Sequence, residues 1–197
     1  MGRSILTRQL GRSLSSIGLI LIPIVAVAGI TLAVVMSSPE SPSFEYLDAF
    51  SARNFTLLTT EGKNYSLKQD LDQGRVVMLD FMATWCKPCL ETGKQLIILK
   101  EKYPSVSLVS ITSSNEDNAV TLGNYSRFHG FDWTFLPYDP VATPDLLIFY
   151  KADIYIPVLV FIDFGGLVRV IHLGTVEFSV MEAWIRGEYY DPRPVPP

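Results

Sequence analysis

Charge is scarce in this chain of 197 residues, because Asp, Glu, Lys and Arg make up only 18% of it, below the quarter or so that is usual for soluble proteins. Two cysteines are too few for a disulfide-rich scaffold. No excess of basic residues is present, since the net charge is −4 and the pI is 5.2, which argues against a nucleic-acid partner. The hydrophobic share of 48% excludes a disordered acidic tail, and the length excludes a large multidomain enzyme.

The few charges are unevenly distributed. Arg3, Arg8 and Arg12 are the only charged residues before Glu40, and the remaining 13 Lys and Arg face all 20 Asp and Glu, which leaves −7 on the rest of the chain. The twenty residues 17–36 carry no charge, and a helix of about 20 residues spans about 30 Å of hydrocarbon. With the arginines before it, this pattern predicts a cytoplasmic basic head (1–16), a transmembrane helix (17–36), a linker (37–43) and an extracytoplasmic body.

A cleaved signal peptide is the alternative interpretation of the same segment. The small residues Ala26-Val27-Ala28 resemble a cleavage site. Cleavage there would leave the apolar residues 29–36 on the mature protein, which favours an uncleaved anchor. Both interpretations place the body outside the cytoplasm, at the cell membrane in the case of the anchor.

The body, residues 44–190, has the pattern of an α/β domain. We expect these elements in order: a hairpin within 44–66, a helical turn at 66–71, strands at 76–82 and 106–111, a helix at 88–103, a helix that begins with a Ser114/Asp117 capping box and runs towards Phe128, a loop at 131–144, a helix at 145–151, strands at 158–162 and 167–173, and a helix at 178–186. This order predicts a central mixed β-sheet flanked by helices, and the proline-rich tail, residues 191–197, should be extended.

The two cysteines carry the clearest functional signal. They stand three positions apart in Cys86-Lys87-Pro88-Cys89, where a buried strand passes into a helix. A thiolate attacks disulfides, and the unpaired N–H groups and positive dipole end of a helix N-terminus favour the thiolate form. Lys87 adds a cation, and Pro88 suits the first turn of a helix. We therefore expect Cys86 to be an exposed nucleophile with a low pKa, tuned by Lys87 and Pro88, and Cys89 to resolve the mixed disulfide.

Other interpretations of this cysteine pair are weaker. A structural disulfide gains little from closing so short a loop, and zinc would need about two more ligands, for which only His129 and His172 are available. Haem attachment requires histidine after the second cysteine, where Leu90 stands.

Two further residues are unusual for their positions. Asp80 lies within the apolar run 76–82, where burial would raise its pKa and allow it to exchange a proton with Cys89; an Asp satisfied by local N–H groups is the alternative. Pro157 opens an apolar strand, and from the residues alone a trans proline at a strand start is favoured.

These residues together resemble the thioredoxin superfamily, and within it the membrane-anchored TlpA/ResA-like branch. The resemblance covers about residues 44–188, and its most specific parts are VVMLDFMATWCKPC (76–89) and YIPVLVFIDFGGLVRVIHLG (155–174). It implies a thioredoxin-like fold, a buried acid at Asp80 and a cis bond at Pro157 against the cysteine pair. It also implies substrate contacts at Trp85, Ile156 and Pro157, with the Ile156 backbone binding an extended substrate strand. The chain departs from the family pattern at Val158, where threonine is common, and at Met82, where an aromatic residue is usual.

The sequence therefore predicts a tethered, extracytoplasmic thiol–disulfide oxidoreductase. Its only redox group would be the Cys86–Cys89 pair, with no other cofactor and no metal. The resemblance implies that a membrane thiol electron carrier recycles the pair, and that the substrates are thiols and disulfides of exported proteins, apocytochromes among them. Two alternatives stay open: a copper chaperone on the same fold with His172 as a third ligand, and a non-catalytic docking module with a structural disulfide.

Overall fold

The computed structural model describes residues 49–189. The predicted basic head, membrane helix and linker, and the tail from residue 191, lie outside this range. Within residues 49–189, no helix combines the length and the apolar character that crossing a bilayer requires.

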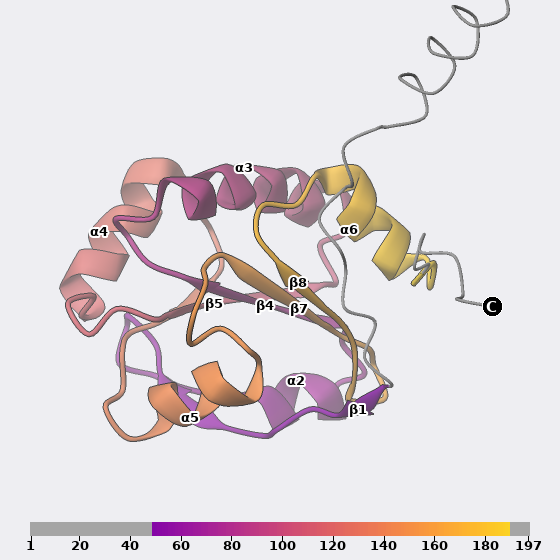
Figure 1. Ribbon diagram of the computed structural model, residues 1–197, viewed down its shortest axis with the longest axis horizontal. Coiled ribbons are helices and arrows are strands. Elements are labelled where there is room, and N and C mark those ends of the chain that lie inside the picture. Colours follow the sequence, from indigo (N-terminus) through magenta and orange to yellow (C-terminus); the bar gives the residue numbers. More distant parts are fainter. Residues whose placement is uncertain (1–48, 190–197) are drawn as a thin grey trace, which may run out of the picture. The chain divides into compact units, whose positions relative to one another are not determined.

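A six-stranded mixed sheet forms the centre of the described domain (Figure 1), in the order β1-β8-β7-β4-β5-β6. The three strands β4, β5 and β6 are parallel, whereas β7, β8 and β1 continue the sheet through antiparallel pairs. The strands are β1 (Phe50–Ser51), β4 (Val77–Met82), β5 (Ser107–Thr112), β6 (Thr134–Leu136), β7 (Val158–Ile162) and β8 (Leu167–Leu173). The predicted mixed sheet flanked by helices is confirmed.

Helices cover both faces of this sheet (Figure 1). One face carries α3 (Lys87–Lys102), α4 (Ala119–His129) and α6 (Phe178–Ile185), and the other carries α2 (Leu67–Asp72), α5 (Ala142–Phe149) and the predicted hairpin of β2 (Thr56–Leu58) and β3 (Asn64–Ser66). All six residues of β4 are buried, because it lies inside the sheet between two layers. Side chains alternate along a strand, so Val77, Leu79 and Phe81 pack towards α2 and α5, while Met78, Asp80 and Met82 face α3.

Two details of the predicted elements are wrong. The helix α4 begins after Asn118, whose side chain accepts from the N–H groups of Val120 and Thr121, so Ser114 and Asp117 do not form the capping box of this helix. The predicted loop 131–144 contains β6, which pairs with β5 at the sheet edge and is too short to show a strand pattern in the sequence, and it also contains the first turn of α5.

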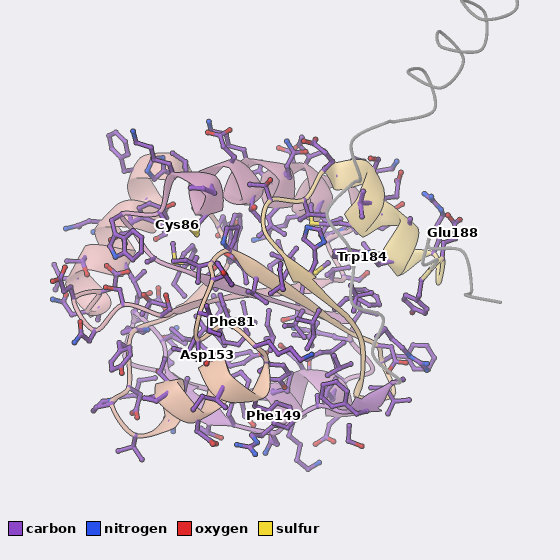
Figure 2. The ribbon with its side chains drawn as sticks, in the orientation of Figure 1. Phe81, Cys86, Phe149, Asp153, Trp184 and Glu188 are labelled. Atoms are coloured by element: carbon purple, nitrogen blue, oxygen red, sulfur yellow. A yellow bond between two sulfur atoms is a disulfide. The ribbon has the colours of Figure 1, made fainter. Side chains whose placement is uncertain are left out.

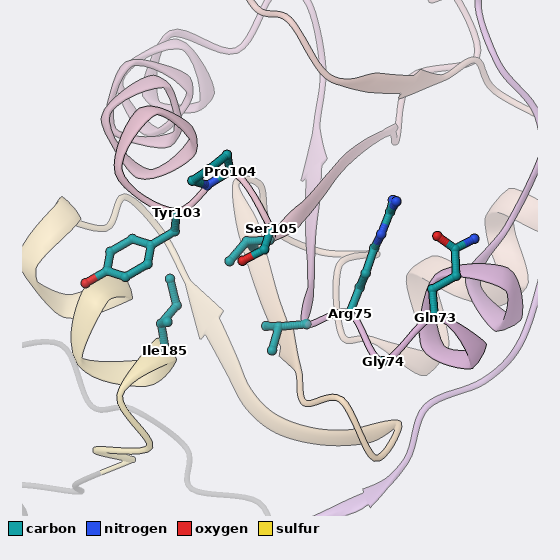
Figure 3. A pocket seen from close by; sticks show the side chains of 9 residues that line it. Gln73, Gly74, Arg75, Tyr103, Pro104, Ser105 and Ile185 are labelled. Carbon is teal, nitrogen blue, oxygen red and sulfur yellow. The ribbon is translucent and has the colours of Figure 1, made fainter.

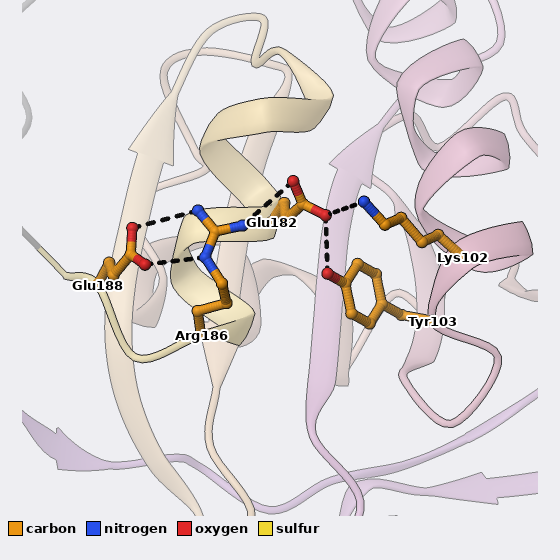
Figure 4. Close-up of polar contacts among 5 residues, drawn as sticks. All are labelled: Lys102, Tyr103, Glu182, Arg186 and Glu188. Atoms are coloured by element: carbon orange, nitrogen blue, oxygen red, sulfur yellow. Dashed lines mark hydrogen bonds and ion pairs between the residues drawn. The ribbon is translucent and has the colours of Figure 1, made fainter.

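A cluster of charged and polar side chains joins the end of α3 to α6 (Figure 4). The Glu182 carboxylate accepts from Lys102 Nζ at 2.5 Å and from the Tyr103 hydroxyl at 2.7 Å. Arg186 pairs with the same carboxylate at 3.1 Å and also with Glu188. These contacts hold the last helix against the end of α3 that lies away from the cysteines.

Candidate active site

Cys86 and Cys89 lie at the start of α3 and are joined by a disulfide bond, with their Cα atoms 5.3 Å apart. Cys86 is the N-cap residue, and the backbone N–H of Cys89 donates to its Sγ at 3.2 Å. Pro88 stands in the first turn, where a backbone N–H has no partner within the helix. The N-terminus of α3 therefore directs a donor and its positive dipole end at the Cys86 sulfur, an arrangement that favours a thiolate once the bond is reduced.

The exposure of Cys86 differs from the prediction. Its exposed fraction is only 5%, and that of Cys89 is 2%, because the pair packs into an apolar cluster that includes Met82. The residues around it provide the accessible surface: Trp85 is 65% exposed, and Lys87 and Pro88 are also exposed. Figure 2 shows Cys86 near the start of α3, at the margin of the helical layer. A substrate would therefore approach across Trp85 and the first turn of α3.

The segment before β7 lies against the same cluster. The Ile156–Pro157 peptide bond is cis, which agrees with the family resemblance and not with the trans bond favoured by the residues alone. Ile156 is half-buried and packs against the apolar cluster that holds both cysteines. The preceding residues Ile154 and Tyr155 are 74% and 67% exposed. The fold thus brings Ile156, a predicted substrate contact, to the cysteine pair, which stands about 70 positions earlier in the sequence.

Asp80 is buried in the sheet, as its position in the apolar run predicts. It pairs in register with Ser110 of β5, and the Ser110 hydroxyl donates to its Oδ2 at 2.8 Å. Burial raises the pKa of Asp80 to about 7, although the Ser110 hydrogen bond acts in the opposite direction. Met82, two residues further along the same face, shares a cluster with the cysteines. A carboxyl group that titrates near neutral pH therefore lies on the side of β4 that α3 covers.

Asp117 contributes to the site in a way that the sequence did not indicate. Its carboxylate accepts from the Thr84 N–H at 2.9 Å, from the Thr84 hydroxyl at 2.5 Å and from the Thr112 hydroxyl at 2.8 Å. The loop that leads into Cys86 is thereby fixed to the end of β5. Only the three-dimensional arrangement reveals this role, because Asp117 follows Thr84 by 33 positions.

His172, the proposed third ligand of a copper site, is engaged elsewhere. Its Nε2 is 2.9 Å from the carbonyl oxygen of Thr175, and its ring contacts that of Trp184 at 5.8 Å. Burial lowers its pKa. Within residues 49–189 no group of three or more His, Cys, Asp or Glu side chains is arranged to hold a metal ion.

A pocket of about 530 Å³ lies at the other end of the domain (Figure 3). Residues 73–76, 103–106 and Ile185 line it. Cys86 and Tyr103 stand at opposite ends of α3, which has 16 residues and is therefore about 24 Å long. The pocket is consequently remote from the disulfide and does not belong to the candidate active site.

A mixed sheet covered by helices, a two-residue disulfide loop at a helix start and a cis-proline segment beside it together define the thioredoxin-like class of proteins. No family model matches the chain. The chain is 30% identical over 168 residues to the thioredoxin-like protein YneN of Bacillus subtilis (strain 168), an alignment that covers 84% of this chain and 92% of that protein. It is 38% identical over 74 residues to the thiol-disulfide oxidoreductase ResA of Bacillus anthracis, covering 35% of this chain and 40% of ResA.

On the similarity to YneN, the chain belongs to the thioredoxin-like family. Its alignments with two plant thioredoxins span about half the length of those proteins. The crystal structure of a thiol:disulfide interchange protein from Chlorobium tepidum TLS has the same fold, with a TM-score of 0.60 and 19% identity over 74% of this chain and 100% of that one. Homologues and structural neighbours of the chain include thiol–disulfide oxidoreductases.

Proposed function

We propose that this protein is a thiol–disulfide oxidoreductase that exchanges disulfides with other proteins through Cys86 and Cys89. The observation that carries the proposal is the disulfide between the only two cysteines of the chain, at the start of α3. Trp85, next to Cys86 in the sequence, and Tyr155, next to Ile156, are exposed and offer apolar surface to a protein substrate. The names of ResA and of the Chlorobium protein point to the same chemistry.

The reaction proceeds by two exchanges at sulfur. The Cys86 thiolate attacks a substrate disulfide, the substrate S–S bond breaks, and one substrate sulfur leaves as a thiolate while the other is bound to Cys86. Cys89 then gives up its proton and attacks Cys86 Sγ, which releases the second substrate thiolate and closes the Cys86–Cys89 disulfide. Two electrons pass from the protein to the substrate, and the reverse sequence oxidises a substrate dithiol.

Asp80 is the proposed proton acceptor for Cys89 in the second exchange. A base works best when its pKa lies near the working pH, and the pKa of Asp80 is about 7. In the reverse sequence, the protonated carboxyl returns the proton as the Cys89 sulfur leaves Cys86. A Lys87 cation beside the pair and the Pro88 turn favour the thiolate of Cys86.

The proposed site of action is the extracytoplasmic side of a membrane. Three arginines followed by the uncharged residues 17–36 support a membrane anchor with the N-terminus in the cytoplasm. The disulfide pair would then work on exported proteins, with apocytochromes as one class of substrate, and a membrane thiol carrier would restore the dithiol.

Reduction of insulin by the full chain tests the exchange chemistry. With dithiothreitol as electron source, the wild-type protein should accelerate insulin reduction, and the Cys86→Ser protein should not, because the attacking sulfur is lost. In a separate reaction from which dithiothreitol has been removed, the reduced Cys89→Ala protein should accumulate a disulfide-linked insulin adduct. This adduct can form only at Cys86, because no other cysteine remains. Full activity of Cys86→Ser, or no adduct with Cys89→Ala, would refute the proposed function.

Labelling in intact cells tests the location. After mild reduction, a thiol reagent that does not cross membranes should label the wild-type chain in intact cells, and the Cys86→Ser/Cys89→Ser chain provides the background. Labelling that requires cell lysis would contradict an extracytoplasmic body. The intact mass of the membrane-bound chain distinguishes an uncleaved anchor from cleavage after Ala28.

A further inference from the structure

The two oxygen atoms of the Asp80 carboxyl group have different surroundings. Oδ2 receives the Ser110 hydroxyl at 2.8 Å. Oδ1 is buried and has no hydrogen-bond partner among the described residues. A carboxyl group that exchanges protons in the interior must do so through one of these oxygens, so the difference between them decides the geometry of proton transfer.

A second hydrogen bond fixes the direction of the first. The indole N–H of Trp133 donates to Ser110 Oγ at 2.9 Å, and an indole nitrogen can only donate. The Ser110 hydroxyl thus already accepts one bond, and its own proton is directed to Asp80 Oδ2. If Oδ2 carried the carboxyl proton, Ser110 would accept two bonds, and its proton would be buried with no acceptor among its contacts in residues 49–189. An unmade hydrogen bond in the interior is unfavourable, so the carboxyl proton belongs on Oδ1.

In addition to Ser110 and Trp133, helices α3 and α4 provide side chains on this face of β4. Along β4, Met78 clusters with Leu96 and Leu99 of α3, while Met82 clusters with Cys86 and Cys89, so Asp80 lies between these two levels of α3. Thr92, one turn after Cys89, has a buried hydroxyl without a partner in the described part of the chain.

Other titratable groups on this side of the sheet include Asp117, His129 and Tyr125. The Asp117 carboxylate accepts from Thr84 and Thr112, and the His129 ring contacts the ring of Tyr125. Tyr125 of α4 has a hydroxyl that lacks a partner in the described residues. Burial, and after it the charges of Asp80 and Asp117, raise its pKa to about 12. Tyr125 therefore stays protonated near neutral pH and does not accept a proton from Cys89.

We propose that Ser110 and Trp133 are positioning residues for the redox reaction: they hold Asp80 Oδ2 as a permanent acceptor and reserve Oδ1 for proton exchange with Cys89. This inference rests on the proposed function. When the mixed disulfide is resolved, the Cys89 S–H bond breaks and an Asp80 Oδ1–H bond forms. The Cys89 thiolate then bonds to Cys86 Sγ, and the electron pair of the broken bond leaves with the substrate sulfur. The proton on Oδ1 passes on to solvent or to that thiolate.

Stopped-flow kinetics with the reduced full chain and an aromatic disulfide that releases a coloured thiolate separate the two exchanges in one trace. The first release reports attack by Cys86, and the second reports resolution by Cys89. In the wild type, the resolution rate should rise with pH around the pKa of Asp80. The Ser110→Ala protein loses a donor that favours the charged carboxylate, so its resolution rate should fall by about 3- to 30-fold at pH 7, with the pH midpoint moved upwards and the first release unchanged.

Matched variants distinguish positioning from a general effect on the fold. Ser110→Thr keeps a hydroxyl and should show the wild-type pH dependence of the resolution rate. Trp133→Phe keeps an aromatic ring but loses the indole donor, so the pH midpoint of its resolution rate should move upwards, as in Ser110→Ala. Ser107→Ala, on the same strand, removes a similar bond to the buried carboxylate of Asp70 and should leave the profile unchanged.

A double-variant comparison completes the test. In the Asp80→Asn background, Ser110→Ala should cause no further loss of the resolution rate, because the group that it positions is absent. Equal losses in both backgrounds, or an unchanged pH profile in Ser110→Ala and Trp133→Phe, would overturn the positioning role. Failure of the proposed function would look different, because the first release would then be missing from the wild type itself.

Discussion

Replacing Asp80 by Asn should remove a pH-dependent loss of stability from the oxidised protein. The pKa of this carboxyl is raised from the ordinary 3.8 to about 7, chiefly by burial. Between these values the folded protein holds a proton that the unfolded chain has released. The unfolding free energy therefore falls as pH rises from about 4 to about 7. Above pH 7 the total loss is about 4 kcal/mol. Asn cannot ionise, so the variant should not show this fall.

Urea denaturation of the oxidised full chain in mild detergent, from pH 4 to pH 9, measures the effect. The difference in unfolding free energy between Asp80→Asn and wild type should grow by up to about 4 kcal/mol, which is about 2 M in the urea midpoint at a typical slope of about 2 kcal/mol/M. Any cost of burying the new amide is the same at every pH and does not alter the trend. A difference that stays constant across this range would refute the reasoning.

Asp163 provides a matched control with the opposite sign. Burial tends to raise its pKa, but the Leu167 N–H and Arg169 outweigh burial and lower it. This carboxylate therefore stabilises the fold above the ordinary pKa of 3.8, and the stabilisation is lost as pH falls through the lowered value. Asp163→Asn should accordingly be less stable than wild type at pH 7, and the difference should shrink towards acidic pH.

Two further substitutions, one in α3 and one in α4, test the packing of helical glycines. Gly93→Ala would place a Cβ 2.5 Å from the ring of Phe131, and should lower the unfolding free energy by roughly 1–3 kcal/mol in urea denaturation. Gly123→Ala, a helical glycine with no atom closer than 3.7 Å, should be neutral or more stable, and an equal loss in both variants would contradict the steric argument. Glu182→Gln should lower the thermal midpoint at pH 7. The Lys102 contact lowers the pKa of Glu182 to about 2, so the difference in thermal midpoint between the two proteins should narrow as pH falls towards that value. A difference in thermal midpoint that does not change with pH would contradict a stabilising role of the ionised carboxylate.

The parts of the site that the sequence predicts are those encoded by neighbouring residues. The apolar run around Asp80 reveals a doubly covered strand, and the spacing of Cys86 and Cys89 at the next helix start reveals the redox pair. Both signals lie within a single strand–loop–helix unit. The cis bond before Pro157 required the family resemblance, because the residues alone favour the commoner trans form.

What the sequence misses depends on contacts between distant segments. Ser110, Asp117 and Trp133 carry no local signal, since each gains its role from a partner 23 to 33 positions away. The exposure of Cys86 was predicted wrongly for the same reason: its burial depends on packing in a cluster to which Ile156, from a distant loop, contributes. Local pattern therefore identifies the reacting atoms, and tertiary structure determines what they can reach.

The stability and kinetic experiments on Asp80 report on one physical quantity. Keeping this carboxyl neutral near pH 7 requires an environment that disfavours its charge, and that same environment makes it a base able to accept and return a proton at neutral pH. The pH at which the oxidised protein stops losing stability and the midpoint of the resolution rate should therefore both lie near 7. Suppose that the unfolding free energy stopped falling near pH 7 but the resolution rate did not change around that pH. The burial of Asp80 would then be a feature of the sheet alone, and Cys89 would pass its proton to another acceptor.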